Sequence, residues 1–308
     1  MENELFKDFY DKRFYISETP PYYAGEKSIT RPLEQVIRSQ EELFSYVMCD
    51  SIQPEAFGRL FYNASILLKG WIDNTKDSPP QETRSLDTKI ELVKNLDLLS
   101  RKELVRAKKH FNDITYSRIT PLKSLQVYEQ FDHKSWGCTD PELIKILAKQ
   151  IHAHMENFDD LLILPLGHGA TRPGFILNHY LNEMDINSII YPVRFSTHKM
   201  KDTDVVFIND MERAYIAELS RGRQVLSFNE DVQTGKSSRY FTGYFKNLLG
   251  KNVTSTTIVQ ETRSDYISDF YAISEDDFLH IMADEEERIK QGQNLSITQK
   301  LAEDNQEN

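Results

Sequence analysis

The sequence predicts an α/β fold, a mostly parallel sheet with helices on both faces, preceded by an N-terminal helical region. From residue 161 onward, short apolar runs alternate with stretches in which apolar residues recur every three or four positions. These short runs are apolar at consecutive positions, which is typical of strands buried on both faces of a parallel sheet. Between residues 32 and 114, apolar residues recur only with helical spacing. We therefore expect an arm and helical region over 1–120, an α/β domain over 121–283 and a polar, partly disordered tail over 284–308.

The composition indicates a globular protein with a substantial core. The chain has 308 residues, of which 39% are hydrophobic, and a net charge of −11. It has no apolar run of membrane-spanning length and no secretory signal at its start, so we expect it in the cytoplasm. The acidic balance, with a pI near 5.3, disfavours nucleic acid and anionic membranes as partners. Cys49 and Cys138 stand apart without further metal-ligand residues nearby, which predicts buried thiols and neither a zinc site nor a disulfide framework.

The first third of the chain predicts an irregular arm followed by helices. Residues 1–31 are aromatic and polar without a period, and Pro32 then begins a helical pattern. Further helical patterns cover residues 55–74 and begin again near residue 90. Ser100 and Glu103 have the spacing of a capping box, which predicts a helix starting between them.

The rest of the chain predicts strands and helices in alternation. Residues 125–131 alternate like a half-buried strand, and Asp140 with Pro141 predicts the cap and first residue of a helix. After these, strands are expected over 161–164, 189–193, 205–208, 225–228 and 253–259, and helices over 173–184, 211–220 and 237–249. Gly250 is expected to end the last helix in a left-handed conformation.

The stretch over 224–238 has the order strand, loop and helix start that suits an anion site. An apolar run ends in Asn229 and Glu230, and Thr234-Gly235-Lys236-Ser237 then opens an amphipathic helix, whose first amides favour a phosphate. The phosphate loop of nucleotide triphosphatases would require a glycine at the position of Glu230. An ordinary strand-to-helix turn is the simpler alternative.

This stretch resembles the PRPP-binding motif of type I phosphoribosyltransferases, in which apolar residues lead to two acidic residues and then to T-G-x-T/S. Asn229 and Glu230 take the places of the acidic pair. The PRPP-binding segment then continues through Asp231, Val232, Gln233, Thr234, Gly235, Lys236 and Ser237.

Two earlier loops match the same family in the same order. Gly167-His168-Gly169 follows the first strand, where the family has its pyrophosphate loop, and a plain turn is the alternative. Arg194 ends the next strand and is followed by Lys199 and Lys201, which match a strand-end arginine and loop lysines; a solvated polar loop is the alternative. The resemblance covers about residues 161–259.

The resemblance implies transfer of phosphoribose from PRPP to a small-molecule nitrogen acceptor, with release of pyrophosphate. The amides and hydroxyls of residues 234–237 would hold the 5′-phosphate, and Glu230 the ribose diol. Arg194, Lys199 and Lys201 would neutralise the pyrophosphate. Mg²⁺ would be bound through PRPP, without dedicated protein ligands. A homodimer is compatible with this interpretation.

Two departures from the motif keep an alternative open. Asn229 replaces an acid, and Gln233 stands where purine-salvage members carry an aspartate that acts on the acceptor proton. A purine acceptor is therefore disfavoured. The alternative function is a noncatalytic PRPP- or nucleotide-sensing regulatory or interaction module on the same fold. Residues 261–273 could contact the acceptor or form a surface turn, and the sequence does not decide between them.

Overall fold

The structure is a computed structural model that describes residues 27–47, 60, 64–68, 70–71, 82–101, 103–115, 126–131, 140–154, 160–167, 169–195, 206, 208–232, 235–261 and 264–280. Several predicted features lie outside these residues: Cys49, Cys138, His168, Lys199, Lys201, Gln233, Thr234 and the tail from residue 284. The helix expected over 55–74 is described only in part, and the described part is helical.

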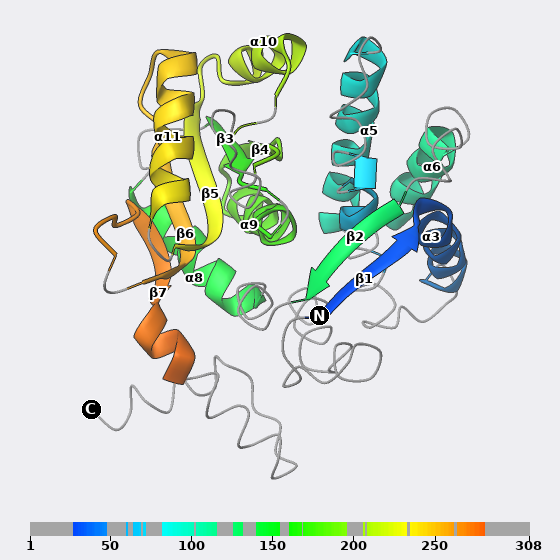
Figure 1. The fold of residues 1–308 in the computed structure, drawn as a ribbon, viewed down its shortest axis with the longest axis horizontal. Coiled ribbons are helices and arrows are strands. Elements are labelled where there is room, and N and C mark those ends of the chain that lie inside the picture. The colour runs from blue at the N-terminus through cyan, green and yellow to red at the C-terminus, as the bar shows by residue number, and fades with distance from the viewer. Residues whose placement is uncertain are drawn as a thin grey trace.

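A five-stranded parallel sheet forms the centre of the fold (Figure 1). Its strands lie in the order β4-β3-β5-β6-β7, and each neighbouring pair is parallel. They are β3 (Asp160–Pro165), β4 (Asn187–Ile190), β5 (Gln224–Val232), β6 (Thr254–Gln260) and β7 (Phe270–Ser274). The α/β class with a parallel sheet is therefore confirmed.

Helices cover both faces of the sheet, because alternate strand residues point to opposite sides. On one face, Leu161 and Ile163 belong to the cluster that contains α8 (Pro141–His154) and α9 (Thr171–Glu183). On the other face, Leu162 and Leu164 pack with α10 (Asp210–Leu219) and α11 (Lys236–Leu249). Asp140 caps α8 as expected, since its Oδ1 accepts from the Glu142 amide at 2.7 Å.

The N-terminal helices lie beside this domain and share its core. They are α3 (Leu33–Val47), α5 (Glu82–Ser100) and α6 (Leu104–Ile114), and Figure 1 shows them on the side of α9. Their buried residues, such as Phe44 and Phe111, belong to the same cluster as the sheet residues Leu161 and Phe228. The helical region is thus packed against the α/β domain through a shared apolar core.

The expectation of an irregular arm up to residue 31 was wrong at its end. Lys27–Pro32 forms β1, which pairs antiparallel with β2 (Gln126–Phe131) in a separate two-stranded sheet. The two strands are about a hundred positions apart in the chain, from Lys27 opposite Phe131 to Pro32 opposite Gln126, so no local pattern marks the pairing. The predicted strand over 125–131 is confirmed as β2.

Three details of the α/β region and one of the N-terminal helical region differ from the sequence prediction. The strand expected over 225–228 extends to Val232, because Asn229 and Asp231 keep pairing with β6. The stretch expected to be a turn or an acceptor contact ends in β7, the edge strand. At the strand expected over 205–208, Val206 makes one antiparallel bridge with Phe195, and Ile208 lies outside any strand. The capping box was also wrong: Ser100 ends α5, and its hydroxyl donates to the Asp97 carbonyl at 2.8 Å.

Within the part of the chain that is described, no helix combines the length and apolar character needed to cross a membrane.

Candidate ligand site at the carboxyl ends of the strands

The sheet has a topological switch point at β3. The chain passes from β3 to β4 on one side and then returns to place β5 on the other side of β3. In open parallel sheets, ligands bind in the crevice beyond the carboxyl ends of the strands at such a point. The segments that follow β3, β4, β5 and β6 all emerge at this edge, since the strands are parallel.

The turn after β3 is hydrogen-bonded to β5 on one side and to the segment after β4 on the other. The Leu166 amide donates to the Phe228 carbonyl at 2.7 Å, and the Gly167 amide donates to the Val193 carbonyl at 2.8 Å. Gly167 has φ +68°, where a side chain is disfavoured, and a β-carbon there would lie 3.2 Å from the Phe195 carbonyl oxygen. This turn therefore bridges the segments on both sides of the switch point.

Glu230 and Gly169 bring two of the predicted site segments together. A β-carbon at position 169 would lie 1.8 Å from Glu230 Oε1 and 2.4 Å from its Cδ, so the carboxylate rests on the glycine backbone. Glu230 is half-buried near the end of β5. The residues expected to hold the ribose and the pyrophosphate thus lie in contact.

Asn229 uses its amide inside the protein. Its Nδ2 donates to Ser238 Oγ at 3.2 Å, and its Oδ1 accepts from the Glu230 amide at 3.1 Å. Ser238 is buried in the first turn of α11. Asn229 therefore joins the end of β5 to the start of the following helix, a connection that does not require an acid.

Gly235 forms the cap of α11 and is covered by an aromatic side chain. It has φ +70°, and a β-carbon there would lie 2.2 Å from Tyr266 Cβ and 3.1 Å from Ser264 Oγ. The Tyr266 hydroxyl lies 3.5 Å from Thr242 Oγ1 on α11, and the Arg239 guanidinium lies 5.7 Å from the ring centroid. Lys236, exposed, and Ser237, half-buried, follow Gly235 as the first residues of α11.

The segment between β6 and β7 is held in place by two side chains. Gln260 Nε2 donates to the Tyr266 carbonyl, and Gln260 Oε1 accepts from the Ser268 amide, both at 2.9 Å. Asp269 Oδ2 accepts from the Ser255 amide at 2.7 Å, which joins the end of this segment to β6. The position of Tyr266 over Gly235 is therefore fixed from both sides.

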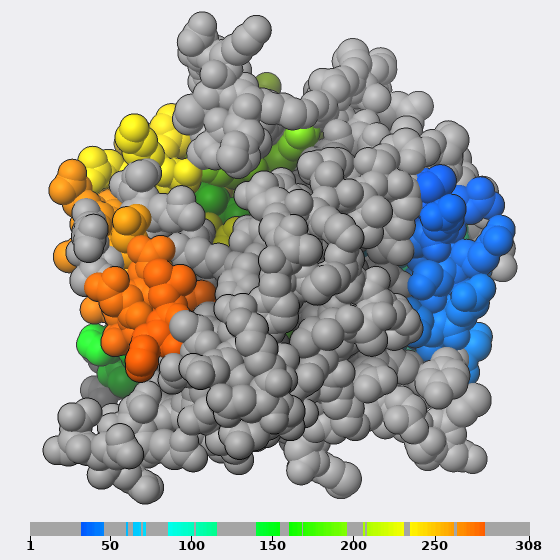
Figure 2. Space-filling model, turned by 60° about the horizontal axis from the view of Figure 1, so that its bottom comes forward, coloured from blue at the N-terminus to red at the C-terminus, as the bar shows by residue number. Residues whose placement is uncertain are grey.

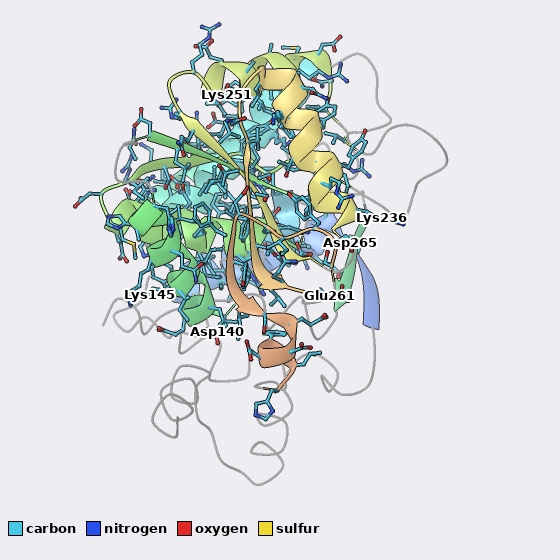
Figure 3. The ribbon with its side chains drawn as sticks, turned by 90° about the vertical axis from the view of Figure 1, so that its left-hand side faces the viewer. Asp140, Lys145, Lys236, Lys251, Glu261 and Asp265 are labelled. Atoms are coloured by element: carbon cyan, nitrogen blue, oxygen red, sulfur yellow. The ribbon has the colours of Figure 1, made fainter. Side chains whose placement is uncertain are left out.

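Figure 3 shows charged side chains of both signs around the first turn of α11. Lys236 lies there together with Asp265 and Glu261 of the segment after β6, whereas Lys251 lies at the opposite end of the helix. In Figure 2, where the bottom of the Figure 1 view comes forward, the orange residues of 264–280 lie on the same side of the molecule as the yellow residues of α11. The edge of the site near β6 is thus of mixed charge.

β4 ends at Ile190 and not at Val193 as expected, so Arg194 lies beyond the strand and does not directly end it; the residue is buried, with 5% of its area exposed. It stands between Val193, which accepts the Gly167 amide, and Phe195, which lies against Gly167. Among the described residues, no group of three or more His, Cys, Asp or Glu side chains is arranged to hold a metal ion.

One residue of this site, Gln260 at the end of a strand, was not singled out from the sequence. Tyr266 lies in the stretch that was expected to be either an acceptor contact or a surface turn. The only signal that could have pointed to Tyr266 is its aromatic character in a polar segment between two strands.

Comparisons with known proteins give a limited likeness. No protein-family model and no curated protein matches the chain. Among solved structures, it is similar to a hypoxanthine-guanine phosphoribosyltransferase from Bacillus anthracis, with a TM-score of 0.33 and 15% identity over 46% of this chain and 77% of the other. It is also similar to the hypoxanthine phosphoribosyltransferase of Trypanosoma cruzi, with a TM-score of 0.35 and 12% identity over 46% of this chain and 78% of the other. A likeness at these values does not assign an activity, which has to be argued from the residues of the site.

Proposed function

We propose that this protein binds PRPP at the carboxyl ends of β3 and β5 and transfers its phosphoribose to a small nitrogen nucleophile. The observation that carries the proposal is the contact between Glu230 and Gly169 at the switch point of the sheet. This contact brings a carboxylate that suits a sugar diol next to a glycine turn that suits a diphosphate. The motif resemblance at residues 224–238 supports the same ligand.

The start of α11 supplies the proposed 5′-phosphate site. The first amides of a helix have no partner within the helix, and the helix dipole adds partial positive charge there. Gly235 at φ +70° lets the chain turn from β5 into α11 with these amides facing the carboxyl edge of the sheet. Lys236 and Ser237 are the first two residues of α11 and would add a positive charge and a hydroxyl at this site.

The pyrophosphate would lie against the turn after β3. In this proposal the bond from C1 to the pyrophosphate oxygen breaks as the bond from C1 to nitrogen forms. The protein contributes by positioning the two reactants and by stabilising the charge that develops on pyrophosphate. The electron pair leaves with pyrophosphate, and the proton of the acceptor nitrogen passes to solvent. Mg²⁺, bound through PRPP without dedicated protein ligands, would add positive charge on the pyrophosphate side. The predicted roles of Lys199 and Lys201 in balancing that charge stay part of the proposal.

A noncatalytic PRPP or nucleotide sensor is the second candidate. It is favoured by the use of the Asn229 amide in bonds to Ser238 and to the Glu230 amide, where the family motif has a second acid. Both candidates use the same pocket and differ in turnover.

Calorimetry with PRPP and Mg²⁺, followed by pyrophosphate release assayed over a panel of amines and nucleobases, tests the proposal. We expect the wild-type chain to bind PRPP and to release pyrophosphate. Glu230→Ala should weaken the binding of PRPP, and Lys199→Ala should lower the turnover. Binding without pyrophosphate release on any acceptor would favour the sensor. No binding of PRPP by the wild-type chain would reject both candidates.

A further inference from the structure

Lys89 extends from the N-terminal helical region into the α/β domain. It lies on α5 with only 5% of its area exposed, and its Nζ is 2.6 Å from Glu212 Oε1 on α10. The same Nζ lies 4.4 Å from the centroid of the Tyr191 ring. A lysine is rarely buried unless it is paired, so this contact is a specific connection between the two parts of the chain.

The partners of Lys89 lie at the two ends of one segment. Tyr191 directly follows β4, and Glu212 lies in the first turn of α10. The Tyr191 hydroxyl donates to the same Glu212 Oε1 at 2.8 Å, and Phe195 bridges to Val206 between them. The Glu212 carboxylate therefore links the two ends of the segment that runs from Tyr191 to Glu212. Lys89 pairs with that carboxylate.

This segment contacts the turn after β3. The Val193 carbonyl accepts the Gly167 amide at 2.8 Å, and the Phe195 carbonyl lies against Gly167, where a β-carbon would come within 3.2 Å. A shift of residues 191–195 thus has to move the turn over 166–170. In the other direction, Gly169 of that turn contacts Glu230.

The Glu212 carboxylate stays ionised and the Tyr191 hydroxyl stays protonated in the neutral range. Burial works against ionisation of Glu212, but Lys89 together with the hydrogen bonds from Tyr191 and the Asn209 backbone outweighs it, and the pKa of Glu212 lies below its usual value. Burial and the neighbouring Glu212 carboxylate raise the pKa of Tyr191 well above its usual value, so its hydroxyl remains a donor. The hydrogen bond and the ion pair therefore form together.

A second, independent contact keeps α5 in place. Asp97 accepts from Asn178 Nδ2 on α9 at 3.1 Å and pairs with Arg101 Nε at 3.0 Å. Loss of the Lys89 charge therefore leaves α5 attached to the α/β domain through α9. The effect of Lys89 can accordingly be separated from detachment of the helix.

We propose that Lys89 is a positioning residue through which the N-terminal helical region sets the turn after β3 and thereby the pyrophosphate side of the site. This inference rests on the proposed function for the identity of the ligand. It gives residues 82–100 a role in ligand binding although α5 does not reach the proposed pocket. Lys89 acts through Glu212 and Tyr191, and not by touching the substrate.

The test compares Lys89→Met, Tyr191→Phe and the double variant Lys89→Met with Glu212→Gln in the full chain. Lys89→Met leaves the Glu212 carboxylate buried without its cation, and the double variant removes that charge. The double variant should therefore keep the fold even if Lys89→Met alone does not. The amide introduced by Glu212→Gln can still accept the hydrogen bond from Tyr191. The matched control is Lys94→Met, which removes the same charge from an exposed position of α5. Each variant is measured by calorimetry with pyrophosphate and with ribose 5-phosphate, in the presence of Mg²⁺, and by hydrogen exchange.

We expect the affinity for pyrophosphate to fall about tenfold in the Lys89 and Tyr191 variants. A loss of this size corresponds to about one hydrogen bond to the ligand, because the amides of the turn would no longer be correctly placed. Affinity for ribose 5-phosphate, whose phosphate would bind at α11, stays within twofold of the wild type. This corresponds to a change in binding free energy of about 0.4 kcal/mol or less. Amide exchange rises at residues 166–167 and 191–195, and Lys94→Met changes none of these quantities.

Equal losses for both ligands, or faster exchange in α5 alone, would overturn the proposal, because Lys89 would then only stabilise the fold. If the wild-type chain binds neither ligand, the proposed function fails. The exchange measurement still decides the coupling in that case: faster exchange at residues 166–167 and 191–195 supports it, and unchanged exchange there rejects it.

Discussion

Glu230 lies on Gly169 so closely that a single methyl group at position 169 would occupy the place of the carboxylate, 1.8 Å from Oε1. The conflict is with the far end of a flexible side chain, which can turn away at little cost. We therefore predict that Gly169→Ala folds with nearly unchanged stability and displaces Glu230. Its affinity for PRPP should fall about tenfold, since one charge-assisted hydrogen bond is worth about 1.5–3 kcal/mol. Thermal unfolding and calorimetry measure the two quantities separately.

A matched glycine on α11 provides the control for this substitution. A β-carbon at Gly243 would meet no atom within 4 Å. Gly243→Ala should stabilise the protein by about 0.5–1 kcal/mol, because alanine is favoured over glycine inside a helix, and it should leave PRPP affinity unchanged. If Gly169→Ala behaves in the same way, the contact with Glu230 has no part in binding.

Gly235 and Gly250 form a second informative pair, because both have positive φ but only one is covered. A β-carbon at Gly235 would lie 2.2 Å from Tyr266 Cβ, whereas at Gly250 it would meet nothing within 4 Å. Gly250→Ala should cost about 1–2 kcal/mol for its left-handed backbone alone. Gly235→Ala should cost about 1–3 kcal/mol more, because Tyr266 has to move. Urea denaturation of the two variants gives the difference, and equal costs would mean that Tyr266 does not rest on Gly235 in solution.

Glu230→Gln separates the two halves of the proposed ligand. The amide keeps the shape of the carboxylate and removes its charge, so contacts with the ribose diol weaken while the amides of α11 are unchanged. We expect affinity for ribose 5-phosphate and for PRPP to fall about tenfold, the loss of one charge-assisted hydrogen bond, and affinity for pyrophosphate to hold or rise. The measurement is calorimetry with each ligand in the presence of Mg²⁺. Lower affinity for pyrophosphate alone would place the carboxylate on the other side of the ligand.

Local signals in the sequence predicted the elements of the α/β region well. Asp140 and Gly250 mark a helix start and a helix end through their own backbone chemistry, and both were placed correctly. The order of strands and helices after residue 160 follows from consecutive apolar runs, which require burial on both faces. The helix expected after Ser100 and Glu103 is present as α6, but its predicted cap was wrong because the Ser100 hydroxyl bonds backward to Asp97 within the preceding helix.

The features that the sequence did not predict depend on contacts between residues far apart in the chain. β1 contains Lys27, Arg31 and Pro32 and becomes a strand only by pairing with β2. β5 continues through Asn229 because Thr257 lies opposite it, although asparagine disfavours strands. At the site, Glu230 and Gly169 were both predicted, but their contact needs the switch point of the sheet. Lys89 and Glu212, which lie 123 positions apart, carry no shared signal in the sequence.

The ion pair between Lys89 and Glu212 gives a prediction with a defined pH dependence. The pKa of Glu212 in the folded protein lies below its usual value of 4.5, so the pair stabilises the fold above that pH and loses its contribution as the pH falls through the lower folded value. In Lys89→Met burial still raises the pKa of Glu212, and only the hydrogen bonds from Tyr191 and the Asn209 backbone remain to lower it, so the carboxylate becomes costly as the pH rises. The variant should therefore lose about 3–5 kcal/mol at pH 7, the usual cost of breaking a buried pair, and progressively less below the usual pKa.

Urea denaturation of the wild type and Lys89→Met at several pH values between neutral and mildly acidic measures this dependence. Tyr191 and Tyr215, which lie near the pair, have pKa values raised above 10 by burial and do not titrate in this range. Lys94→Met is the control, since its exposed pair with Glu91 should contribute about 0–1 kcal/mol. A penalty for Lys89→Met that is constant with pH would show that the lysine stem, through its packing on Tyr191, stabilises this junction and that its charge does not.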